Sequence, residues 1–135
     1  MVDFGYWKKL LRVNLTTGQI TIEEIPEEII TKYMGAKGIG AYYFINGLKK
    51  GIDPLSPENR IVIATGPFQG TDIQSTGRFA TITKSPLTNI FLDTYCGGMF
   101  GPSLKRCGFD LVVIEGRSER PVYISINDNT AQIKD

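Results

Sequence analysis

Residues 75–116 read STGRFATITKSPLTNIFLDTYCGGMFGPSLKRCGFDLVVIEG, and this stretch contains most of the information about the fold. Side chains over 78–84 alternate between two faces, which predicts a half-buried strand. Residues 90–93 predict a second, short strand, and the apolar run over 111–115 is typical of a strand buried in a core. The stretch therefore predicts three closely spaced strands of a sheet.

A Gly-Gly pair lies between the second and the third of these strands. Gly97 and Gly98 precede residues 99–107, which predict a short helix. Pro102 fits only the first turn of this helix, and Gly108 is a C-terminal stop signal. Glycines leave backbone N–H groups uncovered, and the helix dipole makes this end attractive to anions. The pair is therefore a candidate phosphate site. Ordinary turn chemistry is the alternative interpretation.

Outside this stretch the chain combines hairpins with a few helices. A β-hairpin is predicted around Gly18, since glycine accommodates a positive φ. The predicted elements are strands over 9–14, 19–25, 60–65, 122–126 and 131–134 and helices over 26–34 and 38–48. Because the order lacks a regular strand–helix–strand alternation, the sequence predicts an α+β fold, β-rich, with largely antiparallel sheets and a few short helices.

The composition is typical of one globular domain. The chain has 135 residues, of which 41% are hydrophobic and 21% charged. Its 15 basic and 14 acidic residues give a net charge of +1, which argues against a nucleic-acid partner or an anionic membrane surface. The sequence shows neither an apolar run of ~18 residues, as a membrane span needs, nor a signal-peptide pattern. We therefore expect a cytoplasmic location.

Two features of the composition restrict the available chemistry. The sequence contains no histidine, which excludes Ser-His-Asp and Cys-His mechanisms and imidazole metal ligation within this chain. The two cysteines, Cys96 and Cys107, are spaced in a way that fits no zinc or iron–sulfur motif. We expect both to be reduced thiols, and we assign no catalytic residue to this chain.

Short motifs occur in order along almost the whole chain. They are GYWKKLLRVNLTTG at 5–18, YMGAKGIG at 33–40, DPLSPEN at 53–59, ATGP at 64–67, GR at 77–78, TKSPLT at 83–88 and EG at 115–116. This series resembles the N-terminal domain of the aldehyde ferredoxin oxidoreductase family, the tungsten-pterin enzymes. Members of that family are several times longer, so the resemblance implies that residues 1–135 are a single cofactor-binding domain of a longer enzyme.

The resemblance also implies a reaction and a set of partners. The family oxidises aldehydes to carboxylic acids and passes electrons through a 4Fe-4S cluster to ferredoxin. Its cofactor is tungstopterin, a bis-molybdopterin that holds tungsten or molybdenum, with a magnesium ion (Mg) between the pterin phosphates. The cluster cysteines and the acid–base residues lie beyond the matched region, so we expect this segment alone to be inactive and to need the rest of the chain or a complementing subunit. Homo-oligomers are compatible with the resemblance.

A non-catalytic protein is the alternative interpretation. In that case the chain would be a stand-alone β-rich assembly or interaction module. A reading frame that continues into a cysteine-containing region would favour the enzyme.

Arg78 is the first candidate site residue. It follows Gly77, so its backbone can approach a ligand closely, and its guanidinium is suited to bidentate contact with phosphate. A strand-end arginine in a surface ion pair is the alternative from spacing alone. The resemblance implies instead that Arg78 contacts the pterin, because the matching arginine of the family does so.

The remaining candidates lie in the loop that contains the glycine pair. The resemblance implies that Tyr95, Gly97 and Gly98 match the family's pterin-phosphate loop, and that the Tyr95 backbone carbonyl is a ligand of the magnesium ion. Family members often have Asn at the position of Tyr95, which puts any side-chain contact there in doubt. Lys37 stands where the family usually has Arg, and it keeps the charge but loses the fork geometry.

Overall fold

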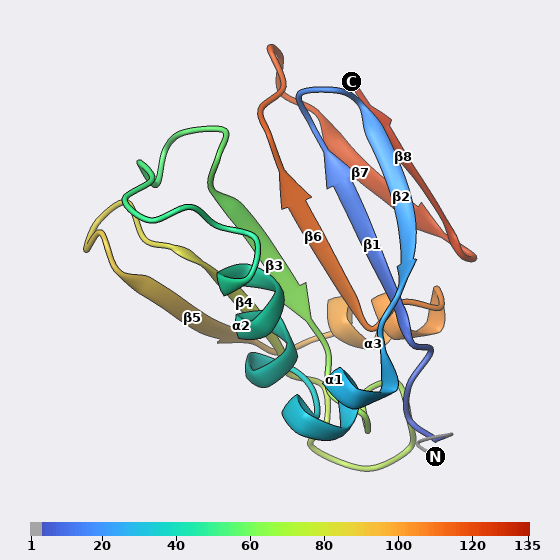
Figure 1. Cartoon of the computed structure of the whole chain (residues 1–135). Coiled ribbons are helices and arrows are strands. Elements are labelled where there is room, and N and C mark those ends of the chain that lie inside the picture. The colour runs from blue at the N-terminus through green and yellow to red at the C-terminus, as the bar shows by residue number, and fades with distance from the viewer. Residues whose placement is uncertain (1–3) are drawn as a thin grey trace.

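The computed structural model describes residues 4–135, and one mixed sheet forms its centre (Figure 1). The sheet has six strands in the order β2-β1-β6-β3-β4-β5. Their bounds are β1 Lys9–Asn14, β2 Gln19–Glu24, β3 Arg60–Ala64, β4 Phe79–Lys84, β5 Phe91–Cys96 and β6 Leu111–Glu115. The helices are α1 Glu27–Tyr33, α2 Lys37–Ile45 and α3 Phe100–Arg106, and a separate hairpin consists of β7 Tyr123–Asn127 and β8 Thr130–Lys134.

The pairing of the strands confirms the predicted α+β class. All neighbours in the sheet are antiparallel except β1 and β6, which run parallel with Leu10 opposite Leu111. These two strands are far apart in the sequence, because three helices and four other strands separate them along the chain. That length of chain permits the crossover that a parallel pair requires.

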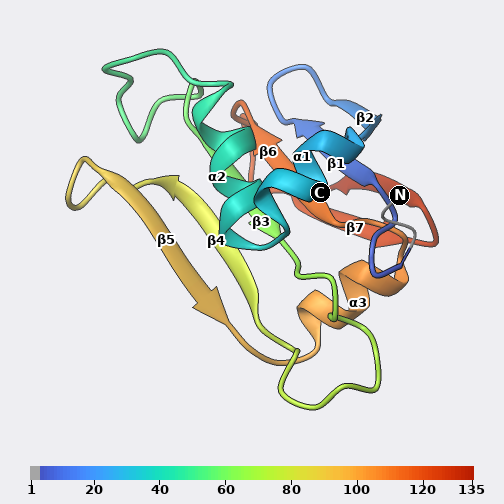
Figure 2. The same ribbon diagram turned by 60° about the horizontal axis from the view of Figure 1, so that its bottom comes forward.

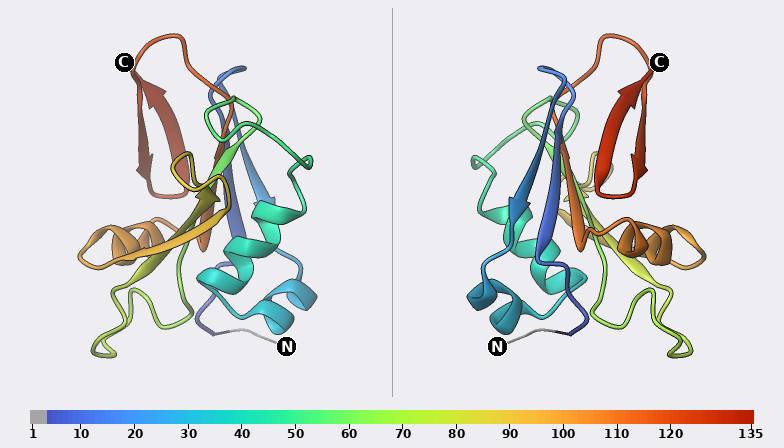
Figure 3. Two further views of the ribbon diagram at one scale, coloured as in Figure 1. Left: turned by 90° about the vertical axis from the view of Figure 1, so that its left-hand side faces the viewer. Right: turned by 90° about the vertical axis from the view of Figure 1, so that its right-hand side faces the viewer.

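The sheet is covered on both faces, and each face has its own core (Figure 3). Helices α1 and α2 cover one face, where the apolar side chains of Leu10, Val62, Ile82 and Val113 are fully buried. Helix α3 and the β7–β8 hairpin pack on the other face. Strand β6 lies between these layers, and its apolar residues enter both cores, as the continuous apolar run predicts.

Strand β5 differs from the other strands of the sheet. It forms an edge, and most of its residues are exposed. The β4–β5 hairpin extends past the helices in Figure 2. The strand is longer than the predicted 90–93, because it pairs with β4 from Phe91 to Cys96. Its alternation is weak in the sequence since most of its residues on both faces are exposed.

The turns and chain breaks expected from the sequence are largely present. Gly18 (φ +71°) and Gly108 (φ +89°) have the positive φ expected of them.

Cys96 and Cys107 are free thiols. The helix predicted over 38–48 is shorter and ends at Ile45, where Asn46 caps it with its N–H on the Tyr42 carbonyl. No helix within residues 4–135 has the length and apolar character needed to cross a membrane.

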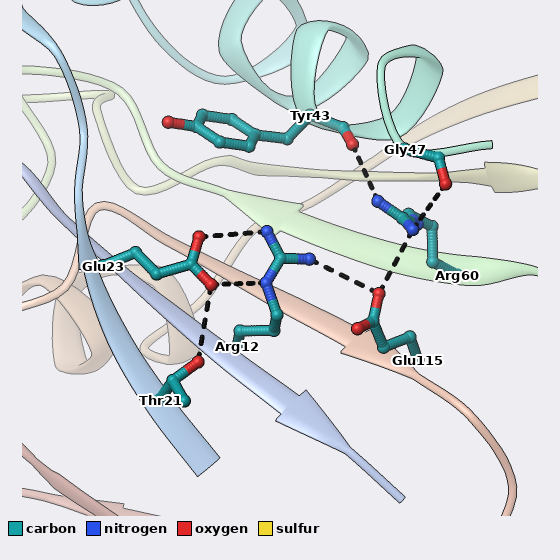
Figure 4. A network of polar contacts seen from close by, with 7 residues as sticks. All are labelled: Arg12, Thr21, Glu23, Tyr43, Gly47, Arg60 and Glu115. Atoms are coloured by element: carbon teal, nitrogen blue, oxygen red, sulfur yellow. Dashed lines mark hydrogen bonds and ion pairs between the residues drawn. The ribbon is translucent and has the colours of Figure 1, made fainter. Parts of the chain in front are cut away.

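A network of charged side chains joins the strands at one side of the sheet (Figure 4). Arg12 on β1 donates two hydrogen bonds to the Glu23 carboxylate on β2, at 2.5 and 3.1 Å. A third donor of Arg12 lies 3.4 Å from Glu115 at the end of β6. The hydrogen bond from Arg12 lowers the pKa of Glu23 below its usual range. Fork-shaped pairing of this kind fixes the register of β2 on β1.

The same network holds the C-terminal end of α2. Arg60, at the start of β3, lies 3.2 Å from the Glu115 carboxylate and donates to the carbonyls of Gly47 (2.6 Å) and Tyr43 (3.3 Å). Burial lowers the pKa of Arg60. These three contacts of the Arg60 guanidinium connect the C-terminal end of α2 to β3 and β6. The helix is therefore held at this end by polar contacts as well as by packing.

Helix α2 approaches the sheet closely because it has glycine at position 40. A Cβ added to Gly40 would overlap the Ile82 side chain and lie 3.4 Å from the Ala64 Cβ. Ile82 and Ala64 are both buried, at 0% and 1% exposure, so neither side chain has free space to move into. Glycine is therefore required here for packing and not for backbone conformation.

We predict that Gly40→Val lowers the free energy of unfolding by about 1–3 kcal/mol, as overpacked cores do. The control is Ala41→Val, one residue further along α2 on a half-buried position, which should cost less than about 1 kcal/mol through helix propensity alone. Urea unfolding of both variants measures the difference. Equal losses would show that α2 has room to move away from the sheet.

Candidate functional site

The residues predicted from the sequence for a cofactor site lie together at one end of the β4–β5 hairpin. The register pairs Phe79 with Cys96, and continuing the ladder by one residue places Arg78 opposite Gly97. A Cβ on Gly77 would lie 3.5 Å from the Gly98 carbonyl oxygen. The two glycine-containing segments, which are separate in the sequence, are therefore in contact, and Arg78 lies beside the glycine pair.

The Arg78 guanidinium is available to a ligand. Its side chain is exposed, and within residues 4–135 none of the ion pairs involves it. It borders a cleft of about 190 Å³, whose other lining residues are Gly66, Pro67, Phe68, Gln69, Ser75 and Thr76. An unpaired arginine at the mouth of a cleft is suited to bind an anionic group. The surface ion pair considered from spacing alone is absent from the described part of the chain.

The two glycines of the pair have different conformations. Gly98 has a φ of +96°, a region that favours glycine, whereas Gly97 is not among the positive-φ residues. No atom lies within 4 Å of a Cβ added at either position. The surface above both residues is therefore open, and their backbone is accessible to a ligand. These open glycines beside an unpaired arginine fit a phosphate-bearing group.

Tyr95 is half-exposed, at 48%, and its side chain makes a contact that the sequence did not indicate. Its hydroxyl donates to the Asp93 carboxylate at 3.1 Å. The same Asp93 oxygen lies 3.1 Å from the Lys37 ammonium of α2. The hydrogen bond to Lys37 is the main reason that the pKa of Asp93 is below its usual value. Partial desolvation and Asp93 raise the pKa of Tyr95.

The side chains of residues 4–135 do not form a metal centre on their own. Within the described residues, no three His, Cys, Asp or Glu side chains come close enough together to hold a metal ion. A metal at this end of the sheet would therefore need donors beyond such a side-chain cluster, for example backbone carbonyls. The expectation for the Tyr95 carbonyl is compatible with this arrangement, since any residue has such an oxygen.

A buried aspartate, Asp110, holds the framework behind the site. Its amide donates to the Lys9 carbonyl at 2.9 Å, and its carbonyl accepts from the Thr65 amide (2.9 Å) and hydroxyl (2.7 Å). Its carboxylate forms an ion pair with Lys105 of α3. The two side chains are only 3% and 7% exposed. Asp110 therefore joins the start of β1, the end of β3 and helix α3.

Further contacts extend from this ion pair to the surface. The Trp7 indole donates to the Lys105 carbonyl at 2.6 Å, and the Lys105 ammonium lies 5.2 Å from the centre of the Tyr6 ring. Burial and the nearby Asp110 charge raise the pKa of Tyr6. The Thr65 carbonyl accepts from the Ala36 amide at 2.9 Å, which connects β3 to the start of α2. Trp7, which is 54% exposed, thus connects the N-terminal segment to α3 at the edge of the domain.

Asp93, Lys105 and Asp110 were not among the residues predicted from the sequence. A usable signal existed for Asp110, because a carboxylate directly before the apolar run 111–115 has to be paired when that strand is buried. No local signal marked Asp93, since its partner Lys37 lies on a distant helix. Only the packing of α2 against the sheet brings these two charges together.

Comparison with known proteins identifies relatives along the whole chain. The family model described as "Aldehyde ferredoxin oxidoreductase, N-terminal domain" matches residues 10–135. The tungsten-containing aldehyde ferredoxin oxidoreductase of Pyrococcus horikoshii is 46% identical over 98% of this chain and 22% of its own length. The aliphatic sulfonate oxidoreductase, WOR-like subunit, of Pyrococcus furiosus is 32% identical, again over 98% of this chain and 21% of its own length.

A solved structure has the same fold. It is the active site complex BamBC of benzoyl coenzyme A reductase with 1,5-dienoyl-CoA, with a TM-score of 0.95 and 30% identity. The similarity covers 98% of this chain and 20% of that one. The chain thus spans about a fifth of the length of the relatives that it matches.

We predict that Asp110→Ala lowers the free energy of unfolding by about 3–5 kcal/mol, because it leaves the Lys105 ammonium buried without a counter-ion. The control is Glu58→Ala, which removes the partner of Lys49 in an exposed pair and should cost less than about 1 kcal/mol. Chemical unfolding of the two variants gives the comparison. A small loss in Asp110→Ala would mean that Lys105 reaches water without its partner.

Proposed function

This chain belongs to the aldehyde ferredoxin oxidoreductase family, and from that premise we propose that it is the N-terminal, cofactor-binding domain of a longer tungsten enzyme. The observation that carries the proposal is the proximity of Arg78 to Gly97 and Gly98 at the end of the β4–β5 hairpin. An unpaired guanidinium beside open glycine backbone suits the phosphate of a pterin cofactor. The tungsten-containing relatives support that choice of cofactor.

In this proposal the domain binds and orients the cofactor. Arg78 would hold a pterin phosphate, and the open backbone at Gly97 and Gly98 would accommodate the same group. The Tyr95 carbonyl would hold a magnesium ion. When bound, tungstopterin supplies the metal centre for two-electron transfer. The protein's part here is placement and electrostatics, not bond making.

The rest of the activity is assigned to parts of the enzyme outside this chain. We propose oxidation of an aldehyde to a carboxylic acid in the cytoplasm, with electrons passing through a 4Fe-4S cluster to ferredoxin. The cluster and the acid–base residues belong to the remainder of the chain or to a complementing subunit. The names of two relatives, a WOR-like subunit and the BamBC complex, support an assembly with partner subunits. They also show that substrates differ among proteins with this domain.

We predict that Arg78→Ala in the complete enzyme lowers bound pterin and tungsten by roughly 10-fold or more, since a charge-assisted hydrogen bond is worth about 1.5–3 kcal/mol. Thermal unfolding of the 135-residue chain should be unchanged, because the exposed side chain has no role in packing. Arg120→Ala, which removes another exposed arginine, is the matched control. Wild-type cofactor content in Arg78→Ala would refute the assigned role.

A second prediction concerns Gly97. Gly97→Val should leave the stability of the 135-residue chain within about 1 kcal/mol of wild type, since the added side chain enters open space at a φ that is not positive. The same change should block cofactor binding in the complete enzyme. Gly98→Val is the contrast, because a β-branched residue at φ +96° is strained and should destabilise the fold itself. If Gly97→Val destabilises the 135-residue chain as well as reducing cofactor content, the result would favour a role of Gly97 in the turn alone.

A further inference from the structure

A negative charge lies on the same face of the sheet as the proposed phosphate site. The ladder pairs Ile82 with Asp93 and Ala80 with Tyr95. Because side chains alternate along a strand, Asp93 and Tyr95 share the face of buried Ala80 and Ile82, which is the face that α2 covers. Continuing the register by one pair beyond Phe79 and Cys96 places Arg78 and Gly97 on the same face. An acidic side chain is thus directed to the side on which an anion would bind.

The distance is short enough for this charge to oppose an anion. Asp93 and Gly97 are four residues apart on an extended segment, or roughly 13 Å at 3.3 Å per residue. The Debye length at low ionic strength, about 30 Å at 0.01 M, exceeds this separation. A carboxylate at this position would therefore repel a phosphate beside Gly97 unless another group neutralised it.

Lys37 is the group that neutralises it. Its ammonium lies 3.1 Å from Asp93 Oδ2, the oxygen that also accepts the Tyr95 hydrogen bond. The Lys37 and Asp93 side chains are 56% and 23% exposed, and an ion pair with this exposure contributes little to stability. Its effect on the local charge remains, because the pair is electrically neutral while Asp93 alone is not.

We propose that Lys37 determines the affinity of the Arg78 site for a phosphate-bearing cofactor by neutralising Asp93. This inference rests on the proposed function and assigns Lys37 a positioning and electrostatic role, not a catalytic one. Asp93 in turn keeps Tyr95 on this face through the hydroxyl hydrogen bond. Lys37 and Asp93 together thus hold the side chain of Tyr95, and they add no net charge to the site.

The test compares Lys37→Met, Asp93→Asn and the double variant in the complete enzyme. Release of tungsten and pterin is followed by dialysis at about 0.01 M and about 1 M salt. Lys37→Met should release cofactor about two- to tenfold faster than wild type at low salt, the range given by Coulomb's law at ~13 Å for effective dielectric constants between 80 and 20. Asp93→Asn should release it no faster than wild type, and the double variant should return to the wild-type rate or below it.

Two controls separate charge from structure. Lys49→Met removes another exposed lysine, whose partner is Glu58, and should leave the release rate unchanged. Glu58→Gln removes the other charge of that exposed pair and should also leave the release rate unchanged. A purely structural ion pair would instead give equal losses in Lys37→Met and Asp93→Asn, no recovery in the double variant and no response to salt. That pattern would overturn the inference.

Arg78→Ala in the same series shows which proposal has failed. Loss of cofactor in Arg78→Ala together with wild-type rates in all Lys37 and Asp93 variants would overturn the role of Lys37 alone. Wild-type retention in Arg78→Ala would overturn the proposed site itself. Thermal unfolding of each variant confirms that the comparison is made between folded proteins.

Discussion

Burial of strand β6 on both faces is the constraint on which the rest of the structure depends. Leu111 and Val113 enter one core and Val112 the other, so both faces of the sheet need a cover. The helices α1 and α2 supply one cover, and α3 with the β7–β8 hairpin supplies the other. Fully buried side chains of this size each contribute about 1.5–3 kcal/mol relative to exposure. A strand in this position tolerates charge only at its ends.

Charged residues do lie at both ends of β6, and each organises one end of the domain. Asp110 precedes the strand and joins β1, β3 and α3, which sets the framework behind the Arg78 site. Glu115 ends the strand and lies between two arginines, one of which holds the C-terminal end of α2. Because α2 is fixed there and packs closely on the sheet through Gly40, its first residue, Lys37, reaches Asp93 on β5.

The candidate site is built where this framework is least covered. Strand β5 is an edge strand with most of its residues exposed, and the glycine pair follows its last residue. Exposed apolar side chains are frequent over 87–100, including Leu87, Tyr95 and Met99. Surface of this kind marks sites of contact with a ligand or with further protein. The sheet therefore combines a buried centre with a largely exposed edge at β5, which suits the proposed role of the domain in holding a cofactor.

The sequence alone predicted most of the elements and the candidate site residues. Alternation over 78–84 and the apolar run over 111–115 predicted β4 and β6, and the glycines at 18 and 108 marked chain reversals, because these signals depend only on neighbouring residues. The resemblance to a family selected Arg78 and the glycine pair. The extent of β5 was underestimated, since a strand with two exposed faces leaves no clear pattern.

Only the tertiary structure decided which distant residues meet. Three contacts show this: the parallel pairing of β1 with β6, the ion pair of Lys105 with Asp110, and the ion pair of Lys37 with Asp93. No periodic pattern in the sequence indicates any of these partners. Such contacts follow from how the layers pack, and packing is a property of the whole chain. The conformational difference between Gly97 and Gly98 likewise appears only in the structure, because two neighbouring glycines do not show in the sequence which of them takes a positive φ.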